Sequence, residues 1–312
     1  HFTCNKLPNV GRINLTYALT EHGTTRTEYT IVRLKQDEYY LISAGAWTAY
    51  DYDFLQKSAD DWMAEGKGHV DIHDVTTQWG VYALAGPNAR ALLKDIVKDA
   101  DPETVLSNKR FPWLSSRDIE LGMCPVRAIR VAYTGELGWE LHYPIEFGRY
   151  LWDLIWSVGE KHGLKAVGAR AQNWLRQEKS YRAFGNELGR DATPLEADLP
   201  RFVDLSKEFR GKAKMLETGV RFKCVTVLID GPTDADPWGK EALIHDGIKV
   251  GRLTSGGYSV AFGKQIGMGY VPVDLAVPGQ KLKVKMQLKE WDAVVTEDSP
   301  FDPSNARIRI DG

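Results

Sequence analysis

Residues 133–140 (YTGELGWE) hold the side chains best suited to chemistry in this sequence. Two glycines flank Glu136, which predicts a tight turn between strands, because glycine tolerates the positive-φ backbone that such turns require. Tyr133 and Glu140 border the turn, and either side chain could point into a cleft. A carboxylate there can accept two parallel hydrogen bonds from a ligand with adjacent N–H donors, such as a 2-amino-4-oxo pterin. A plain β-turn with solvated acidic side chains explains the same residues, so both interpretations stay open.

A second charged segment lies at residues 168–188 (GARAQNWLRQEKSYRAFGNEL) and predicts a helix over residues 168–182. Glu178 and Arg182 are four residues apart, so they are expected to pair across the surface of that helix. Arg170, at the start of the helix, could instead reach a carboxylated ligand.

Metal and nucleotide signatures are weak or missing. His69 and His73 lie in HVDIH, but the residues between them alternate as in a strand and no third ligand is near. We therefore expect a structural role for this pair and no metal site. The GxGxxG, P-loop, HExxH and GxSxG patterns do not occur, which disfavours a flavin or nicotinamide site within this chain. Three widely spaced cysteines without a CxxC pair predict a reducing compartment: the cytoplasm, or the mitochondrial matrix in a eukaryote.

Composition narrows the class of partner. The 312 residues include 40 Lys and Arg against 42 Asp and Glu, a formal charge of -2, with 43% hydrophobic and 11% aromatic residues. This balance argues against disorder, and without a basic excess it argues against nucleic acid or an anionic membrane as partner. The longest apolar run, near residues 39–47, is too short to span a bilayer. The length predicts two domains, and the ligand is expected to be small.

The apolar pattern predicts two β-rich stretches on either side of a central helical segment. Residues 28–34 and 38–43 are β-branched and aromatic, and Gln36-Asp37 lies between them, which predicts a hairpin. From Arg221 onward, short strands separated by glycine and proline turns predict an all-β module, with the domain boundary within residues 211–219. Further elements are expected as helices at 49–65, after 86–88 and at 145–161, and as strands at 79–85 (buried), 116–121 and 125–133.

Four linked motifs together resemble the folate-binding aminomethyltransferase family, typified by the T-protein of the glycine cleavage system. They are RVAYTGELGWELHYP at 130–144, GARAQNWLRQEKSYRAFGNEL at 168–188, TPLEADLPRFVDLSKEFRGK at 193–212 and GRLTSGGYSVAFGKQIGMGYV at 251–271. The same module forms the C-terminal half of dimethylglycine and sarcosine dehydrogenases, and the tail of this chain looks closest to that branch.

The resemblance implies an α+β fold, a three-lobed cloverleaf around a folate channel with a C-terminal all-β barrel or jelly-roll-like domain. We expect an aminomethyltransferase-like domain at residues 1–214 and the barrel at residues 215–312. Family members usually carry some tens of residues before the position of His1, which predicts a fragment or a separately encoded subunit with an incomplete first lobe.

The resemblance also implies an activity. In the family, tetrahydrofolate accepts a one-carbon unit, released as formaldehyde or an iminium, and becomes 5,10-methylenetetrahydrofolate. By motif position Glu140 matches the carboxylate that anchors the pterin, Tyr133 its aromatic neighbour, and Arg170 the arginine near the folate. The flavin half that would oxidise an N-methylated amine such as dimethylglycine or sarcosine is expected in a partner domain or subunit, so FAD is expected there and not in this chain.

Glu28 stands where the family has its catalytic aspartate, on an early strand (TEYTIVRL, residues 27–34). A carboxylate near the nucleophilic folate nitrogen can position it and manage its proton. The side chain here is one methylene longer, which moves the charge by about 1.5 Å, and catalytic geometry is sensitive to such shifts. Transfer is therefore expected to be slower than in the family, or adapted to another donor.

Two other functions remain open at this point. Direct demethylation of a sulfonium or methoxy compound would give 5-methyltetrahydrofolate from the same pterin site. A non-catalytic folate-binding or assembly subunit would fit the substituted aspartate and the short first lobe.

Overall fold

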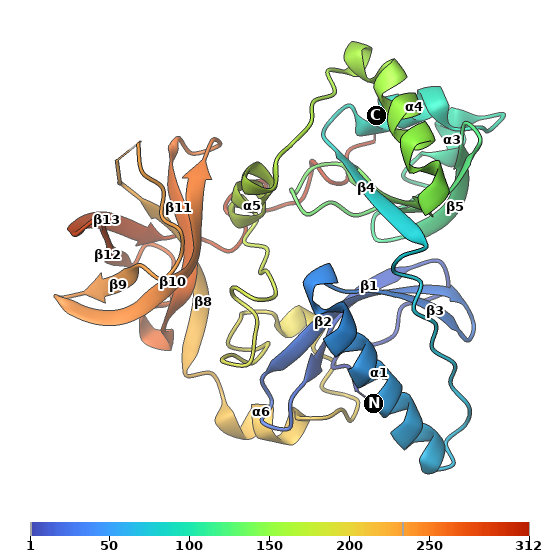
Figure 1. Ribbon diagram of the computed structural model, residues 1–312. Helices are drawn as coiled ribbons and strands as arrows, with labels where there is room; N and C mark the ends of the chain where they lie inside the picture. The colour runs from blue at the N-terminus through green and yellow to red at the C-terminus, as the bar shows by residue number, and fades with distance from the viewer. Residues whose placement is uncertain (1, 233, 312) are drawn as a thin grey trace.

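The computed structural model describes residues 2–232 and 234–311, and it divides into three lobes, each built on its own β-sheet (Figure 1). A three-stranded sheet forms the first lobe, a four-stranded sheet the second, and a closed six-stranded barrel the third. The expected α+β cloverleaf with a C-terminal all-β domain is confirmed. No helix among the described residues is long and apolar enough to cross a membrane.

The first lobe begins with an antiparallel meander. It consists of β1 (Ile13–Leu19), β2 (Thr25–Lys35) and β3 (Glu38–Ile42), with the long helix α1 (Thr48–Ala64) packed against it. Buried and half-buried residues alternate along most of β2, as expected for a strand with two different faces. Phe54 of α1 packs against Tyr29 and Ile31 on one face. The predicted hairpin and the predicted helix at 49–65 are both confirmed.

The second lobe is a four-stranded antiparallel sheet in the order β4-β7-β6-β5. Its strands are β4 (Trp79–Ala85), β5 (Ser116–Leu121), β6 (Cys124–Ile129) and β7 (Gly138–Pro144), and its helices are α2 (Ala89–Ile96), α3 (Pro102–Val105) and α4 (Gly148–Gly159). Trp139, Leu141 and Tyr143 of β7 enter the core, so Glu140 and His142 point to the opposite face of the sheet.

One expectation in this lobe was wrong. Residues 79–85 were predicted as a buried strand, but β4 lies at the edge of its sheet and only Leu84 is fully buried. A short apolar run cannot report whether its strand has one neighbour or two, and the remaining side chains of an edge strand keep contact with solvent.

The third lobe is the barrel, in the strand order β10-β11-β8-β13-β12-β9. Its strands are β8 (Phe222–Ile229), β9 (Ala242–His245), β10 (Ile248–Ser259), β11 (Lys264–Pro272), β12 (Lys281–Met286) and β13 (Lys289–Val295). Val227, Leu253 and Val284 are fully buried in its interior. The short helix α6 (Lys212–Thr218) precedes the barrel and lies within the predicted boundary segment.

Helix α5 (Ala169–Glu178) lies beside the barrel and ends four residues before the predicted position (Figure 1). Ser180 adopts a positive φ of 54°, which interrupts the helix and turns the chain. The expected Glu178–Arg182 pair across the helix surface is therefore wrong. Glu178 accepts hydrogen bonds from Ser259 Oγ (2.5 Å) and the Ala261 amide (3.2 Å), whereas Arg182 donates to Asp298 (2.7 Å).

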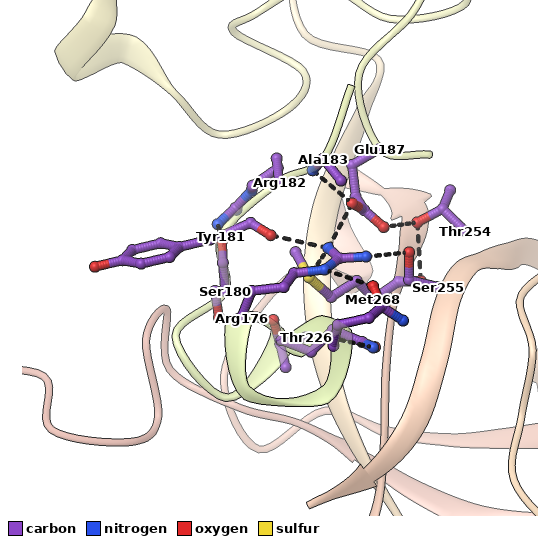
Figure 2. Close-up of polar contacts among 12 residues, drawn as sticks. Arg176, Ser180, Tyr181, Arg182, Ala183, Glu187, Thr226, Thr254, Ser255 and Met268 are labelled. Atoms are coloured by element: carbon purple, nitrogen blue, oxygen red, sulfur yellow. Dashed lines mark hydrogen bonds and ion pairs between the residues drawn. The ribbon is translucent and has the colours of Figure 1, made fainter. Parts of the chain in front are cut away.

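A buried ion pair joins α5, the turn after it and the barrel (Figure 2). Arg176 Nη1 lies 2.7 Å from Glu187 Oε2, and both side chains are 0% exposed. Arg176 also donates to Ser255 Oγ on β10 and to the Tyr181 carbonyl, at 2.5 and 2.8 Å. Glu187 in turn accepts from Thr254 Oγ1 at 2.7 Å. We call this contact between α5, the turn after it and the barrel the joint. Because nearly every polar atom of the ion pair has a partner, the joint is held in one arrangement.

The chain after β13 returns from the barrel to the second lobe as an extended tail, residues 296–311 (Figure 1). Lys179, at the end of α5, donates to the carbonyls of Phe301 and Asp302 at 3.0 and 2.7 Å. Farther along, Arg130 of the second lobe donates to the Ile308 carbonyl at 3.2 Å. The tail thereby connects the third lobe to the second.

The buried pair gives a test of this joint. Glu187→Gln leaves the Arg176 charge in a dry site without its counter-ion, so we expect the free energy of unfolding to fall by about 3–5 kcal/mol. Urea denaturation measures the change. Asp153→Asn, which breaks the exposed Arg149–Asp153 pair on α4, is the control and should leave the denaturation midpoint unchanged. Equal midpoints for both variants would contradict a structural role for the buried pair.

Candidate functional site

Glu28 sits in the middle of β2, directly opposite Tyr17 on β1. It accepts a hydrogen bond from the Tyr17 hydroxyl, and its side chain is half-buried on the face of the sheet that carries Tyr17. Burial raises the pKa of Glu28 to about 7, against an ordinary value of 4.5, and the Tyr17 hydrogen bond only partly opposes this. A carboxyl with this pKa exchanges its proton readily near neutral pH, which is what general acid–base catalysis requires.

Tyr133 lies in the loop that leads from β6 to β7 of the second lobe. Its hydroxyl donates to the Arg182 carbonyl at 3.5 Å, and its ring stacks on Tyr181 with 6.2 Å between centroids. Burial raises the pKa of Tyr133, with smaller effects from the charges of Arg176, Glu187 and Glu28. That Tyr133 and Glu28 face one ligand stays a prediction from the sequence.

The turn between Tyr133 and Glu140 is contacted by two other segments of the chain, the end of α5 and the tail. Gly135 has a φ of 78°, and a Cβ there would meet Lys179 Cγ at 2.3 Å, so both conformation and space require glycine. Glu136 forms an ion pair of 2.8 Å with Arg307 of the tail. The acidic residue of the turn therefore faces the tail, which leaves Tyr133 and Glu140 as the groups free to face a ligand.

Glu140 lies on β7 between Ala83 of β4 and Ile129 of β6, on the face away from the core. Its side chain is 31% exposed, and Oε2 lies 3.3 Å from Nε2 of His142. The side chain is thus partly accessible to a ligand while one carboxylate oxygen is held by the protein.

Arg170 lies elsewhere, at the start of α5. Its Nη2 is 2.6 Å from Asp236 Oδ2 on the barrel loop, and its guanidinium lies over the rings of Trp174 and Trp238 at 5.2 and 5.5 Å. The side chain is 59% exposed. Among the described residues these contacts are shared with neither Glu28 nor Glu140, so the four predicted residues do not form one cluster.

Several neighbours of the site were not predicted. Tyr17 looks like one more apolar residue of an alternating strand, and only the strand register shows that it faces Glu28. Arg176 and Glu187 were part of a recognised motif, but their pairing needs the chain reversal at Ser180. His142 could have been found, because it lies two residues after Glu140 on a strand and must share its face.

Candidate metal ligands do not gather in the described part of the chain, where no group of three His, Cys, Asp or Glu side chains could hold an ion. The expected strand alternation around His69 is wrong, because residues 68–75 form an irregular, largely exposed segment in which His69 lies 3.0 Å from Asp71. The cysteines Cys4, Cys124 and Cys224 are buried and free.

The raised pKa of Glu28 predicts a pH effect on stability. Because the folded-state pKa lies above the unfolded one, the folded chain holds this proton more tightly, and the resulting stability is lost as pH rises from about 4.5 through 7. Glu28→Gln removes the cost of ionising a buried carboxyl. The free energy of unfolding of the variant, relative to that of the unaltered protein, should therefore rise by about 1–2 kcal/mol between pH 5 and 8. Urea denaturation across this range measures it. The same trend in Glu160→Gln, an exposed carboxylate, would show that the effect does not belong to Glu28.

Comparison with known proteins adds an independent observation. The family model described as the GCVT N-terminal domain matches residues 1–207, and the glycine cleavage T-protein C-terminal barrel domain matches residues 223–302. Mitochondrial dimethylglycine dehydrogenase of Mus musculus is 35% identical, over 100% of this chain and 36% of the enzyme. The aminomethyltransferase of Natranaerobius thermophilus is 30% identical, over 93% of this chain and 77% of that protein.

A solved structure agrees on the fold. The glycine cleavage system aminomethyltransferase T from Bartonella henselae matches with a TM-score of 0.80 at 24% identity, over 95% of this chain and 78% of that one. The chain spans only about a third of the length of the mouse dehydrogenase, whereas it matches most of the bacterial aminomethyltransferase. Both family models and both kinds of relative lead to one conclusion: the chain belongs to the glycine cleavage T-protein family of aminomethyltransferases.

Proposed function

We propose that this protein binds tetrahydrofolate between its first and second lobes and promotes transfer of a one-carbon unit to it, giving 5,10-methylenetetrahydrofolate. The observation that carries the proposal is Glu28, a half-buried carboxyl on β2 with a pKa near 7 that lies opposite Tyr17 of β1. Membership of the aminomethyltransferase family supports the reaction class.

The side chains present fit a reduced folate. Glu140 offers a partly exposed carboxylate for the adjacent N–H groups of a pterin. Tyr133 is 36% exposed, and its ring offers a flat apolar surface for the pterin. Arg170 already binds one carboxylate, that of Asp236. A carboxylate at the far end of the folate could take the place of Asp236 on the same guanidinium.

The residues divide the work as follows. When bound, tetrahydrofolate would supply the two nitrogens that take up the one-carbon unit, with the formaldehyde oxygen leaving as water or, from an iminium, the amine leaving. Glu140 orients the ring, and Glu28 accepts and returns the proton at the reacting nitrogen, because its pKa lets it hold either state near neutral pH. Tyr17 keeps the Glu28 carboxyl in place through its hydrogen bond. Tyr133 covers the site and limits the entry of water.

The source of the one-carbon unit is also a proposal. Relatives that cover the whole chain include dimethylglycine dehydrogenase, and a sarcosine dehydrogenase of Mus musculus is 29% identical over 94% of this chain. In both, this chain matches only about a third of the length. We propose that a flavin-dependent dehydrogenase domain or subunit oxidises an N-methylated amine or amino acid and delivers formaldehyde or an iminium, with FAD bound to that partner.

Glu28→Gln tests the catalytic step. The amide preserves the size of the side chain and its bond to Tyr17 but cannot exchange a proton, so turnover should fall by about 10²–10⁴. The assay follows 5,10-methylenetetrahydrofolate formed from tetrahydrofolate and formaldehyde, after subtraction of the uncatalysed reaction. The Kd for tetrahydrofolate should stay within about twofold, because the change removes a step rather than a binding contact.

The control for this assay is Glu38→Gln, an exposed residue at the start of β3 in the same hairpin, which should retain full turnover. Unchanged turnover in Glu28→Gln would refute the catalytic role. Formation of 5-methyltetrahydrofolate from sulfonium or methoxy donors would instead identify a demethylase.

Glu140→Ala tests the pterin anchor. Loss of a charge-assisted hydrogen-bonding partner should weaken tetrahydrofolate binding by about ten- to a hundredfold in isothermal calorimetry. Glu120→Ala, an exposed carboxylate on β5 of the same lobe, is the matched control and should bind as before. If Glu140→Ala binds tetrahydrofolate with unchanged affinity, the pterin site lies elsewhere; if the unaltered protein does not bind it at all, the chain has a structural role.

A further inference from the structure

His142 is a buried polar residue that the proposed reaction does not use. It lies on β7, is 1% exposed, and both of its ring nitrogens have a partner. Nε2 lies 3.3 Å from Glu140 Oε2, and Nδ1 lies 3.1 Å from the hydroxyl oxygen of Tyr40. The Tyr40 ring also meets the imidazole edge to face, with 5.5 Å between centroids. His142 thus lies between the Tyr40 hydroxyl and the Glu140 carboxylate.

The chemistry of the two partners determines the tautomer. An ionised carboxylate can only accept hydrogen bonds, and a neutral imidazole has one donor and one acceptor nitrogen. Burial raises the pKa of Tyr40, so its hydroxyl keeps its proton and can donate. The consistent chain has the Tyr40 hydroxyl donating to Nδ1 and the Nε2–H group donating to Glu140.

The chain of hydrogen bonds also crosses between lobes. Tyr40 belongs to β3 of the first lobe, whereas His142 and Glu140 belong to β7 of the second. Arg127 of β6, the strand neighbour of His142, lies over the Tyr40 ring at 5.2 Å and is itself fixed by Asp118 at 3.0 Å. Tyr40 therefore has little freedom to leave Nδ1.

We infer that His142 is a positioning residue for the ligand: as the Nε2–H tautomer selected by Tyr40, it holds the Glu140 carboxylate in the orientation that receives the pterin N–H groups. The inference rests on the proposed function, in which Glu140 anchors tetrahydrofolate. A partly exposed glutamate side chain normally samples several rotamers, and fixing it before binding removes the entropic cost of fixing it afterwards.

The test compares His142→Leu with His142→Gln. The leucine cannot donate to Glu140, so tetrahydrofolate binding should weaken by about three- to tenfold in calorimetry. The glutamine amide can both donate to Glu140 and accept from Tyr40, so it should restore affinity close to the original value. Tyr40→Phe should weaken binding as well, whereas Tyr39→Phe, whose hydroxyl meets the Gln36 carbonyl in the exposed turn, should not.

A spectroscopic readout keeps the test independent of ligand. In ¹⁵N NMR of the free protein, His142 should appear as the Nε2–H tautomer, and Tyr40→Phe should mix in the Nδ1–H form. An Nδ1–H tautomer in the unaltered protein would overturn the inference whether or not folate binds. If His142→Leu binds tetrahydrofolate with full affinity while Glu140→Ala loses binding, the inference about His142 is overturned. If Glu140→Ala retains binding, the proposed function is refuted instead.

Discussion

The arrangement of this molecule depends on one buried ion pair, Arg176 with Glu187. Burying two charges is costly, and the mutual attraction compensates only when geometry and surrounding hydrogen bonds are nearly complete. Here the bond is 2.7 Å, and Ser255, Thr254 and the Tyr181 carbonyl satisfy the remaining groups. Such a network has few acceptable alternatives, so it fixes how helix α5 and the chain after it meet the barrel.

The candidate site depends on that joint because the joint and the tail hold its turn. Tyr133 stacks on Tyr181, whose carbonyl accepts from Arg176, so the aromatic face of the site is tied to the buried pair. Lys179 packs behind Gly135 and binds the tail, and Arg307 of the tail holds Glu136. Glu28 approaches from the first lobe on a separate sheet. The site is therefore assembled from segments that only the complete three-lobed fold brings together.

Much of the architecture could be predicted from the sequence, and the exceptions have physical causes. Alternation and two-residue turns give local strand signals, so the first hairpin and the barrel strands were recognised. The end of α5 was missed because Ser180 takes a positive φ that no local pattern announces. Tyr133 contacts Tyr181 and the Arg182 carbonyl, and Glu28 lies opposite Tyr17; neither contact has a local signal in the sequence. Arg170 turns toward Asp236, a carboxylate 66 residues away, and such a pairing depends on tertiary packing alone.

In the proposed function, Glu28 of the first lobe and Glu140 of the second act on one bound ligand. A crystal structure of the protein with tetrahydrofolate tests this most directly. We expect the pterin N–H groups within about 3 Å of the Glu140 carboxylate, with the reacting nitrogens on the side of Glu28. Folate bound away from both carboxylates, or bound at Glu140 with its nitrogens turned from Glu28, would contradict it.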